Sequence, residues 1–338
     1  MSIYGHQQAS IPIADRSCIG EARRLSAEMA ERARLKAADT GRVPLIVSEL
    51  ATNLLLHAQS GEILLRIVPV ELGPAVEIIA IDRGPGMADL KRCLTDGYSS
   101  VGTRGCGLGA VRRLSTDFDI YSTQPAGTAV LSRVRSFDAP LNAQIQFSAI
   151  STPAPNETEC GDAWYVRHAE QRLSAIVVDG LGHGPLAALA ATEALRVFIE
   201  HSFNSPVHYL EAVHVALHAS RGAAIAMAAV ELESHRLHFA GVGNISGCLV
   251  NASGKSQSLL SHNGIVGAHI RKLQQLEYQW NNGDLLIMHS DGMSTRWKLS
   301  SYPGLMLADT GVIAAILYRD CKRGRDDATI LVARLKAN

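Results

Sequence analysis

Four separated aspartates are the residues of this sequence whose types and spacing most directly suggest chemistry. They are Asp162 in CGDAW, Asp179 in VVDGLGHG, Asp291 in MHSDGM and Asp326 in GRDDATILV. Carboxylates at the ends of neighbouring strands converge, and buried like charges are costly unless a cation neutralises them. Oxygen ligands suit hard divalent cations, so the four together predict a metal site, although any one Asp-Gly pair predicts only a turn.

A second group of polar residues lies in VSELATNLLLHA, which places Glu49, Asn53 and His57 four residues apart. At the helical period these side chains form one line beside an apolar stripe. A carboxylate next to a carboxamide suits a general base beside a divalent-metal ligand. A solvated helix flank is the alternative for this spacing, and His57 is interpreted as structural.

Glycine-rich segments follow this helix, and they allow the backbone to approach a ligand closely. The last cluster stands at the start of a helix, where amide groups and the helix dipole favour phosphate. The sequence contains no G-x-x-x-x-G-K-[ST] pattern, which excludes a P-loop, and the Rossmann pattern does not fit because the Gly-x-Gly follows a loop and not a strand. The candidate residues are Asp82, Gly84 and Gly86 in IDRGPGM, Gly105, Gly107 and Gly109 in GTRGCGLGAVRRL, and Thr128 in GTAV.

The order of these elements over residues 15–135 resembles the GHKL, or Bergerat, ATP-binding domain of histidine kinases, gyrase and MutL. Within that fold it is most similar to the small serine kinases of the RsbT, RsbW and SpoIIAB group. The resemblance implies ATP with Mg²⁺ as the cofactor. It implies that Glu49 activates the substrate hydroxyl, that Asn53 binds Mg²⁺ and that Asp82 binds the adenine amino group. Implied contacts to the nucleotide are Gly84, Gly86 and Thr128 at the adenine pocket and Gly105, Gly107 and Gly109 at the phosphates.

The order of the aspartates over residues 145–336 resembles the metal-dependent type 2C serine/threonine phosphatases of the SpoIIE, RsbU and RsbX branch. Further similar segments are SRGAAIAMAAVEL (220–232), FAGVGNISG (239–247) and HNGIVG (262–267). Phosphatases of this kind use two metal ions to activate water and clamp the phosphoryl oxygens, so no phosphoenzyme is needed.

This second resemblance implies two Mn²⁺ or Mg²⁺ ions bridged by Asp179, with the Gly180 carbonyl on one of them. Asp291 and Asp326 would complete the shell of the second ion, and Asp162 would bind directly or through water. Oxygen ligands accept either metal. His183 is interpreted as a loop histidine near the site.

A chain of 338 residues exceeds what one core comfortably holds, so two domains are expected. The linker-like SFDAPLNAQ places the boundary between residues 1–138 and 139–338. Both halves mix helices with strands in hairpin-like succession, which predicts an α+β class. The resemblances imply an N-terminal Bergerat α/β sandwich followed by a type 2C phosphatase-like αββα sandwich.

Composition excludes several function classes. The 32 basic and 32 acidic residues balance, which disfavours nucleic-acid binding. The longest apolar run, GAAIAMAAV, is far short of a membrane span, and the first residues lack the features of a signal peptide. Six dispersed cysteines fit reduced thiols, so a cytoplasmic location is expected.

Together the two halves predict a bifunctional regulator that phosphorylates and dephosphorylates serine or threonine on a STAS-domain protein of the partner-switching type. Phosphorylation adds about −1.5 to −2 charges, enough to break or create an interface with a sigma-factor regulator. The alternative is a phosphoserine phosphatase whose first domain only binds a nucleotide or sequesters a partner such as a sigma factor. Kinases of this group often pair, so a homodimer is one expectation.

Overall fold

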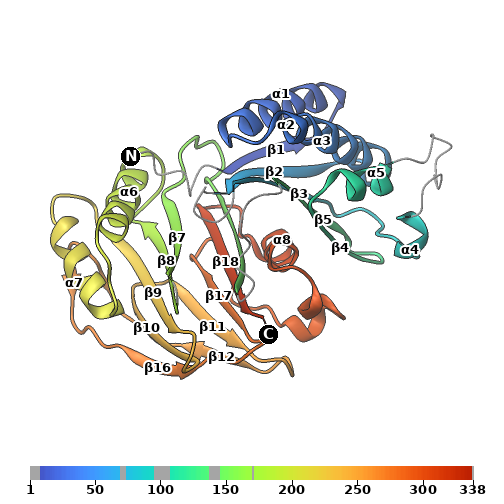
Figure 1. Cartoon of the computed structure of the whole chain (residues 1–338). Coiled ribbons are helices and arrows are strands. Elements are labelled where there is room, and N and C mark those ends of the chain that lie inside the picture. The colour runs from blue at the N-terminus through green and yellow to red at the C-terminus, as the bar shows by residue number, and fades with distance from the viewer. Residues whose placement is uncertain (1–7, 69–73, 95–106, 137–144, 170, 337–338) are drawn as a thin grey trace. The chain divides into compact units, whose positions relative to one another are not determined.

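The computed structural model describes residues 8–68, 74–94, 107–136, 145–169 and 171–336, and the chain divides into two compact units (Figure 1). The N-terminal unit comprises Ser2–Asn142 with Leu307–Arg319, and the C-terminal unit comprises Ala143–Met306 with Asp320–Asn338. The predicted boundary at 138/139 lies outside the described residues and stays a prediction. The segment 307–319 joins the N-terminal unit although it comes from the second half of the sequence.

The N-terminal unit is built on one antiparallel sheet with strand order β1-β2-β3-β5-β4, and helices α1, α2 and α3 line one of its faces (Figure 1). Its strands are β1 (Gln8–Ile13), β2 (Gly61–Val68), β3 (Ala75–Ile81), β4 (Asp117–Thr123) and β5 (Gly127–Arg135). Its helices are α1 (Arg16–Arg32), α2 (Ala37–Thr40), α3 (Arg42–Asn53), the π-helix η1 (Leu54–Ala58), α4 (Leu90–Cys93), α5 (Gly107–Leu114) and α8 (Thr310–Cys321) as far as Arg319.

Apolar residues on one side of each helix pack against apolar residues of the sheet. Val47 and Leu50 of α3 are fully buried against Val76 and Ile78 of β3 in one hydrophobic cluster. Helix α1 begins after Asp15, whose carboxylate accepts a hydrogen bond of 2.7 Å from the amide of Ser17, as a helix cap does. Because Val47 and Leu50 of α3 face the sheet, the polar residues of this helix lie on its other sides.

The opposite face of this sheet carries a buried network of ion pairs. Because side chains alternate along a strand, Glu77 points away from Val76 and Ile78. Its carboxylate lies 2.6 Å from Arg66 Nη2 and 2.7 Å from Arg133 Nε. Burial opposes its ionisation, but the charges of Arg66 and Arg133 outweigh burial and lower the pKa of Glu77 to about 2. Arg133 in turn donates two hydrogen bonds of 2.8 Å to the carboxylate of Asp309.

Further contacts tie the segment 307–319 to this face. The amide of Asp309 donates to Asp119 Oδ2 at 2.6 Å, and the hydroxyl of Tyr318 donates to Glu62 Oε1 at 3.2 Å. The segment 307–319 is therefore held in the N-terminal unit by part-buried polar contacts.

The C-terminal unit stacks two mainly antiparallel sheets, ordered β13-β10-β9-β8-β7, with β16 also paired to β10, and β12-β11-β17-β18-β6. The strands of the first sheet are β7 (Asp162–Ala169), β8 (Arg172–Gly180), β9 (Ala223–Glu231), β10 (Arg236–Val242), β13 (Ser261–His262) and β16 (Leu276–Gln279). Those of the second are β6 (Ile145–Thr152), β11 (Ser246–Val250), β12 (Ser256–Leu259), β17 (Leu285–His289) and β18 (Ala328–Leu335). A small hairpin pairs β14 (Gly264–Ile265) with β15 (His269–Ile270), and short 3-10 turns cover Leu299–Ser301 and Leu305–Leu307.

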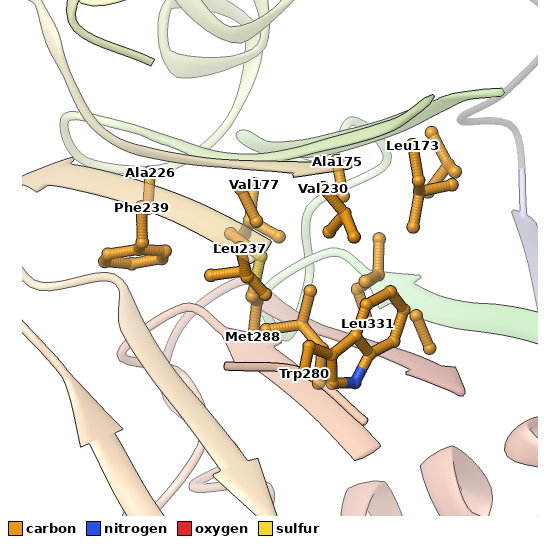
Figure 2. Close-up of a cluster of buried hydrophobic side chains, with 14 of the residues drawn as sticks. Leu173, Ala175, Val177, Ala226, Val230, Leu237, Phe239, Trp280, Met288 and Leu331 are labelled. Atoms are coloured by element: carbon orange, nitrogen blue, oxygen red, sulfur yellow. The ribbon is translucent and has the colours of Figure 1, made fainter. Parts of the chain in front are cut away.

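Apolar side chains from both sheets form the core between them, as Figure 2 shows for Val177 of β8, Phe239 of β10 and Met288 of β17. Trp280 is fully buried there, and its indole N–H donates to the carbonyl of Asp284 at 3.1 Å. Helix α6 (Pro185–Glu200) packs on β7 and β8, and α7 (Pro206–Ala216) packs on β9 and β10. Among the described residues, no helix combines the length and hydropathy needed to cross a bilayer.

Candidate functional site

Glu49 and Asn53 lie on the last turns of α3, on the half-buried flank beside the apolar stripe. The predicted single line does not continue to His57, because α3 gives way after Asn53 to the π-helix Leu54–Ala58. The wider π turn displaces His57 from the line, and its side chain is exposed. Only Glu49 and Asn53 therefore share one polar flank.

The first residue of α5 lies against Asn53. A Cβ placed on Gly107 would come 3.2 Å from Asn53 Oδ1, so a side chain there would crowd the carboxamide. The N-terminus of α5 therefore lies beside the predicted metal ligand, and the amide groups at a helix N-terminus favour anions in general. Gly109 is buried in the same helix, and Gly105 lies outside the described residues.

Asp82 is fixed at the end of β3 by backbone hydrogen bonds. Its Oδ1 accepts from the amide of Gly84 at 2.7 Å and from the amide of Thr128 at 3.2 Å. Burial raises the pKa of Asp82, and these two hydrogen bonds oppose that rise. Gly86 has φ +69°, and a Cβ there would lie 2.4 Å from the carbonyl oxygen of Thr123, so the turn requires glycine.

Four hydrogen bonds near Asp82 and Thr128 involve residues that no sequence motif indicates. Ser122 Oγ lies 2.9 Å from Thr128 Oγ1 and accepts a hydrogen bond of 2.8 Å from the amide of Met87. Arg319 donates to the carbonyl of Asp82 at 3.2 Å, and Arg83 donates to the carbonyl of Arg319. The end of the segment 307–319 thus contacts the loop after β3.

The predicted metal-binding aspartates gather at one end of the stacked sheets. Asp162 and Asp179 are cross-strand partners at the paired ends of β7 and β8. Ser290 Oγ donates to Asp162 Oδ2 at 2.6 Å and accepts from the amide of Thr329 at 3.0 Å, which joins the two sheets at this end. Asp291 follows Ser290, and its Oδ2 accepts a hydrogen bond of 2.7 Å from Asn244 Nδ2.

The adjacent residues Asp326 and Asp327 have different environments. Asp327 is 3% exposed, and its two carboxylate oxygens accept from the amides of Ala154 at 2.8 Å and Gly161 at 2.9 Å. Asp327 is thereby committed to holding the loop before β7. Asp326 is half-exposed, and its Oδ1 accepts from the amide of Asp327 at 2.9 Å. This difference favours Asp326 as the residue with oxygens available to an ion.

Burial and mutual repulsion disfavour the charged forms of the carboxylates at this end of the unit. Burial, followed by the charge of Asp162 and the other aspartates, raises the pKa of Asp179 to about 9. Burial also raises the pKa of Asp162 to about 8, against the hydrogen bond from Ser290. Such a group of carboxylates fits a divalent cation, which would favour their charged forms. No three acidic, histidine or cysteine side chains of the described residues enclose an ion as they lie, and Mg²⁺ commonly retains several water ligands.

Gly180 is fixed next to Asp179 by close packing of the backbone. Its amide donates to the carbonyl of Gly161 at 3.0 Å, and a Cβ at this position would lie 2.2 Å from the carbonyl oxygen of Ala187. The exposed His183 lies three residues on, and its Nδ1 is 2.7 Å from Glu157 Oε1. The sequence motifs assign no role to Glu157 or to Ser290, although Ser290 directly precedes Asp291 in MHSDGM.

Comparisons with known proteins match each half of the chain. The family described as "Histidine kinase-like ATPase domain" matches residues 14–133, and "Stage II sporulation protein E (SpoIIE)" matches residues 169–336. Serine/threonine-protein kinase RsbT of Bacillus subtilis (strain 168) is 33% identical over 125 residues, which are 37% of this chain and 94% of that protein. Phosphoserine phosphatase RsbX of the same strain is 25% identical over 154 residues, which are 45% of this chain and 77% of that protein.

A solved structure agrees with the second match. RsbX in complex with magnesium has a TM-score of 0.51 at 21% identity, and the match covers 58% of this chain and 98% of that one. This likeness is one of fold. Both resemblances and the α+β fold class predicted from the motifs are confirmed.

Proposed function

This chain belongs to the histidine kinase-like ATPase family through residues 14–133 and carries a SpoIIE-family phosphatase domain over residues 169–336, and on that premise we propose a bifunctional regulator. The N-terminal unit would phosphorylate serine or threonine on a STAS-domain protein, and the C-terminal unit would remove the phosphate. What supports the proposal is that one chain holds Glu49 and Asn53 on one flank of α3, with the first residue of α5 beside Asn53, and a cluster of repelling carboxylates in its other unit.

In the proposed kinase reaction, Glu49 would accept the proton of the substrate hydroxyl as that oxygen bonds to the γ-phosphorus of ATP, the bond to the β–γ bridging oxygen breaks and ADP leaves. Asn53 would hold Mg²⁺, and the position of Gly107 against Asn53 Oδ1 favours phosphates there. The amides of Gly84 and Thr128 hold Asp82 through its Oδ1. Its Oδ2 would accept a hydrogen bond from the adenine amino group. Gly86, Gly105 and Gly109 are proposed as backbone contacts to the nucleotide.

In the proposed phosphatase reaction, two Mn²⁺ or Mg²⁺ ions would be held by Asp179 and the Gly180 carbonyl, with Asp291, Asp326 and Asp162 completing the site. When bound, the metals supply Lewis-acid activation of the phosphoryl group and of water. Ser290 positions Asp162, and Asn244 positions Asp291, so these carboxylates keep their direction while their charges repel. His183 is proposed only as a loop residue near the site.

The test uses the full chain, a purified STAS-domain protein from the same genome and labelled ATP. Asp179→Asn protein with ATP and Mg²⁺ is expected to label the STAS protein, and the Glu49→Ala/Asp179→Asn double variant is expected not to. After removal of ATP, Glu49→Ala protein with Mn²⁺ should release the label, whereas Asp179→Asn should not. Glu28→Ala, on the exposed face of α1, and Glu211→Gln, on the exposed face of α7, are the matched controls.

The second candidate function is a phosphoserine phosphatase whose N-terminal unit only binds a nucleotide or a partner such as a sigma factor. The similarity to RsbX by itself would support this simpler activity. It predicts that Asp179→Asn protein leaves the STAS protein unlabelled while Glu49→Ala protein still removes phosphate from a phosphorylated STAS protein. Retention of both activities in both single variants would overturn the assignment of residues.

A further inference from the structure

The turn before β9 carries an arginine that the proposed reaction does not use. Strands β8 and β9 pair in a register that places Gly180 opposite Ala223. The pairing extends one step beyond the strands, because the amide of Leu181 donates to the carbonyl of Gly222 at 3.0 Å. Arg221 is therefore held alongside the loop that follows Asp179.

The guanidinium of Arg221 lies over this loop at Gly182. A Cβ placed on Gly182 would come 3.2 Å from Arg221 Nη1. Gly182 itself adjoins the aspartates: a Cβ on Gly161 would lie 3.5 Å from the Gly182 carbonyl oxygen and 2.7 Å from Asp327 Oδ2. Gly161 also directly precedes Asp162, so Arg221 stands at the edge of the carboxylate cluster.

The backbone at Arg221 is fixed while its side chain is exposed. Ser220 Oγ accepts from the amide of Gly222 at 3.0 Å and donates to the carbonyl of Leu217 at 2.7 Å, which defines the turn. Gly222 takes a φ of +83°. Unlike the buried Arg66 and Arg133, Arg221 makes no hydrogen bond or ion pair with the described part of the chain. Its five N–H donors are available to an anion.

We propose that Arg221 binds the phosphate of the phosphoserine or phosphothreonine substrate in the phosphatase site, an inference that rests on the proposed function. A guanidinium matches two phosphate oxygens with two parallel hydrogen bonds, which a lysine ammonium cannot do. Ionised aspartates repel a phosphate dianion, so a cation at their edge favours substrate binding. The plain alternative is a solvated arginine that only moderates the negative charge of the cluster.

The experiment compares Arg221→Ala and Arg221→Lys with Arg172→Ala, an exposed arginine at the opposite end of β8. Steady-state rates are measured with Mn²⁺ on a phosphoserine protein and on para-nitrophenyl phosphate, together with inhibition by inorganic phosphate and half-saturation by Mn²⁺. We expect Arg221→Ala to raise KM for both substrates and the phosphate inhibition constant about tenfold or more, as loss of a charged hydrogen bond implies. Arg221→Lys should recover part of that loss, and Mn²⁺ half-saturation should not change.

Unchanged KM and phosphate inhibition in Arg221→Ala would overturn the inference, as would a change confined to Mn²⁺ half-saturation. An inactive wild-type protein would count against the proposed function alone. In that case calorimetric titration of inorganic phosphate into the Mn²⁺-loaded proteins decides about Arg221. About tenfold weaker binding to Arg221→Ala than to Arg172→Ala supports the inference, and equal binding refutes it.

Discussion

Replacing Glu77 by glutamine should selectively destabilise the N-terminal unit. Glu77 is 1% exposed and is shared by Arg66 and Arg133, so the substitution leaves two buried guanidinium groups with one anionic partner fewer. The two arginines lower the pKa of Glu77 from 4.5 to about 2, against the effect of burial. Since a tenfold change in proton affinity is worth about 1.4 kcal/mol, the ionised carboxylate stabilises the fold by about 3 kcal/mol at neutral pH.

Urea unfolding of the full chain measures this effect in the right unit. The three tryptophans, Trp164, Trp280 and Trp297, all belong to the C-terminal unit, so their fluorescence reports that unit, whereas far-UV circular dichroism reports both. The N-terminal unit should give a dichroism transition that has no counterpart in fluorescence. With a urea m-value of about 1 to 3 kcal/mol per molar, Glu77→Gln should lower the midpoint of this transition by about 1 to 3 M. Glu28→Gln, the same change on the exposed face of α1, should leave it in place.

The stabilisation by Glu77 depends on pH. Because the folded-state pKa of Glu77 lies below 4.5, the stabilisation is present above about pH 4.5 and is lost as the pH falls toward about 2. The difference between wild type and Glu77→Gln should therefore shrink on acidification. A Glu77→Gln midpoint that coincides with that of Glu28→Gln at pH 7, or a difference that persists unchanged at low pH, would show that the ionised Glu77 does not stabilise the N-terminal unit.

Three further outcomes are expected. Asp309→Asn should weaken the two 2.8 Å hydrogen bonds that Asp309 accepts from buried Arg133. It should therefore lower the midpoint of that same dichroism transition by about 1 M or more. A shift only in the fluorescence transition would contradict the assignment of 307–319 to the N-terminal unit. Ser290→Ala should raise the Mn²⁺ concentration for half-maximal phosphatase activity about tenfold by removing the 2.6 Å hydrogen bond to Asp162, with an unchanged metal titration as the contrary result. Gly180→Ala should abolish phosphatase activity, because its Cβ would lie 2.2 Å from the Ala187 carbonyl oxygen, while ATP binding measured by calorimetry stays at the wild-type level; full phosphatase activity would show that the loop can relax.

Periodicity and motif order in the sequence were enough to predict the main helices and strands and to indicate the two families. The stripe from Val43 to Leu54 predicts α3, and the alternation in the strands predicts two α+β units, because side chains facing a core recur at the period of the element. The order of Glu49, Asn53, Asp82 and the glycine loops was specific enough to indicate the ATPase family. The four aspartates did the same for the phosphatase family, and both indications are confirmed.

Tertiary structure alone decided what each polar group is bound to. The resemblance implies Asp326 as a metal ligand, but the role of the adjacent Asp327 depends on its hydrogen bonds from the amides of Ala154 and Gly161, far away along the chain. The π-helix that moves His57 off the line of Glu49 and Asn53 leaves no periodic signal in the apolar stripe. The attachment of 307–319 to the N-terminal unit depends on the pairing of Asp309 with Arg133. These contacts join residues that are distant in the chain. The periodicity of apolar residues shows which face of a helix or strand is buried, but it does not show which residues pack against that face.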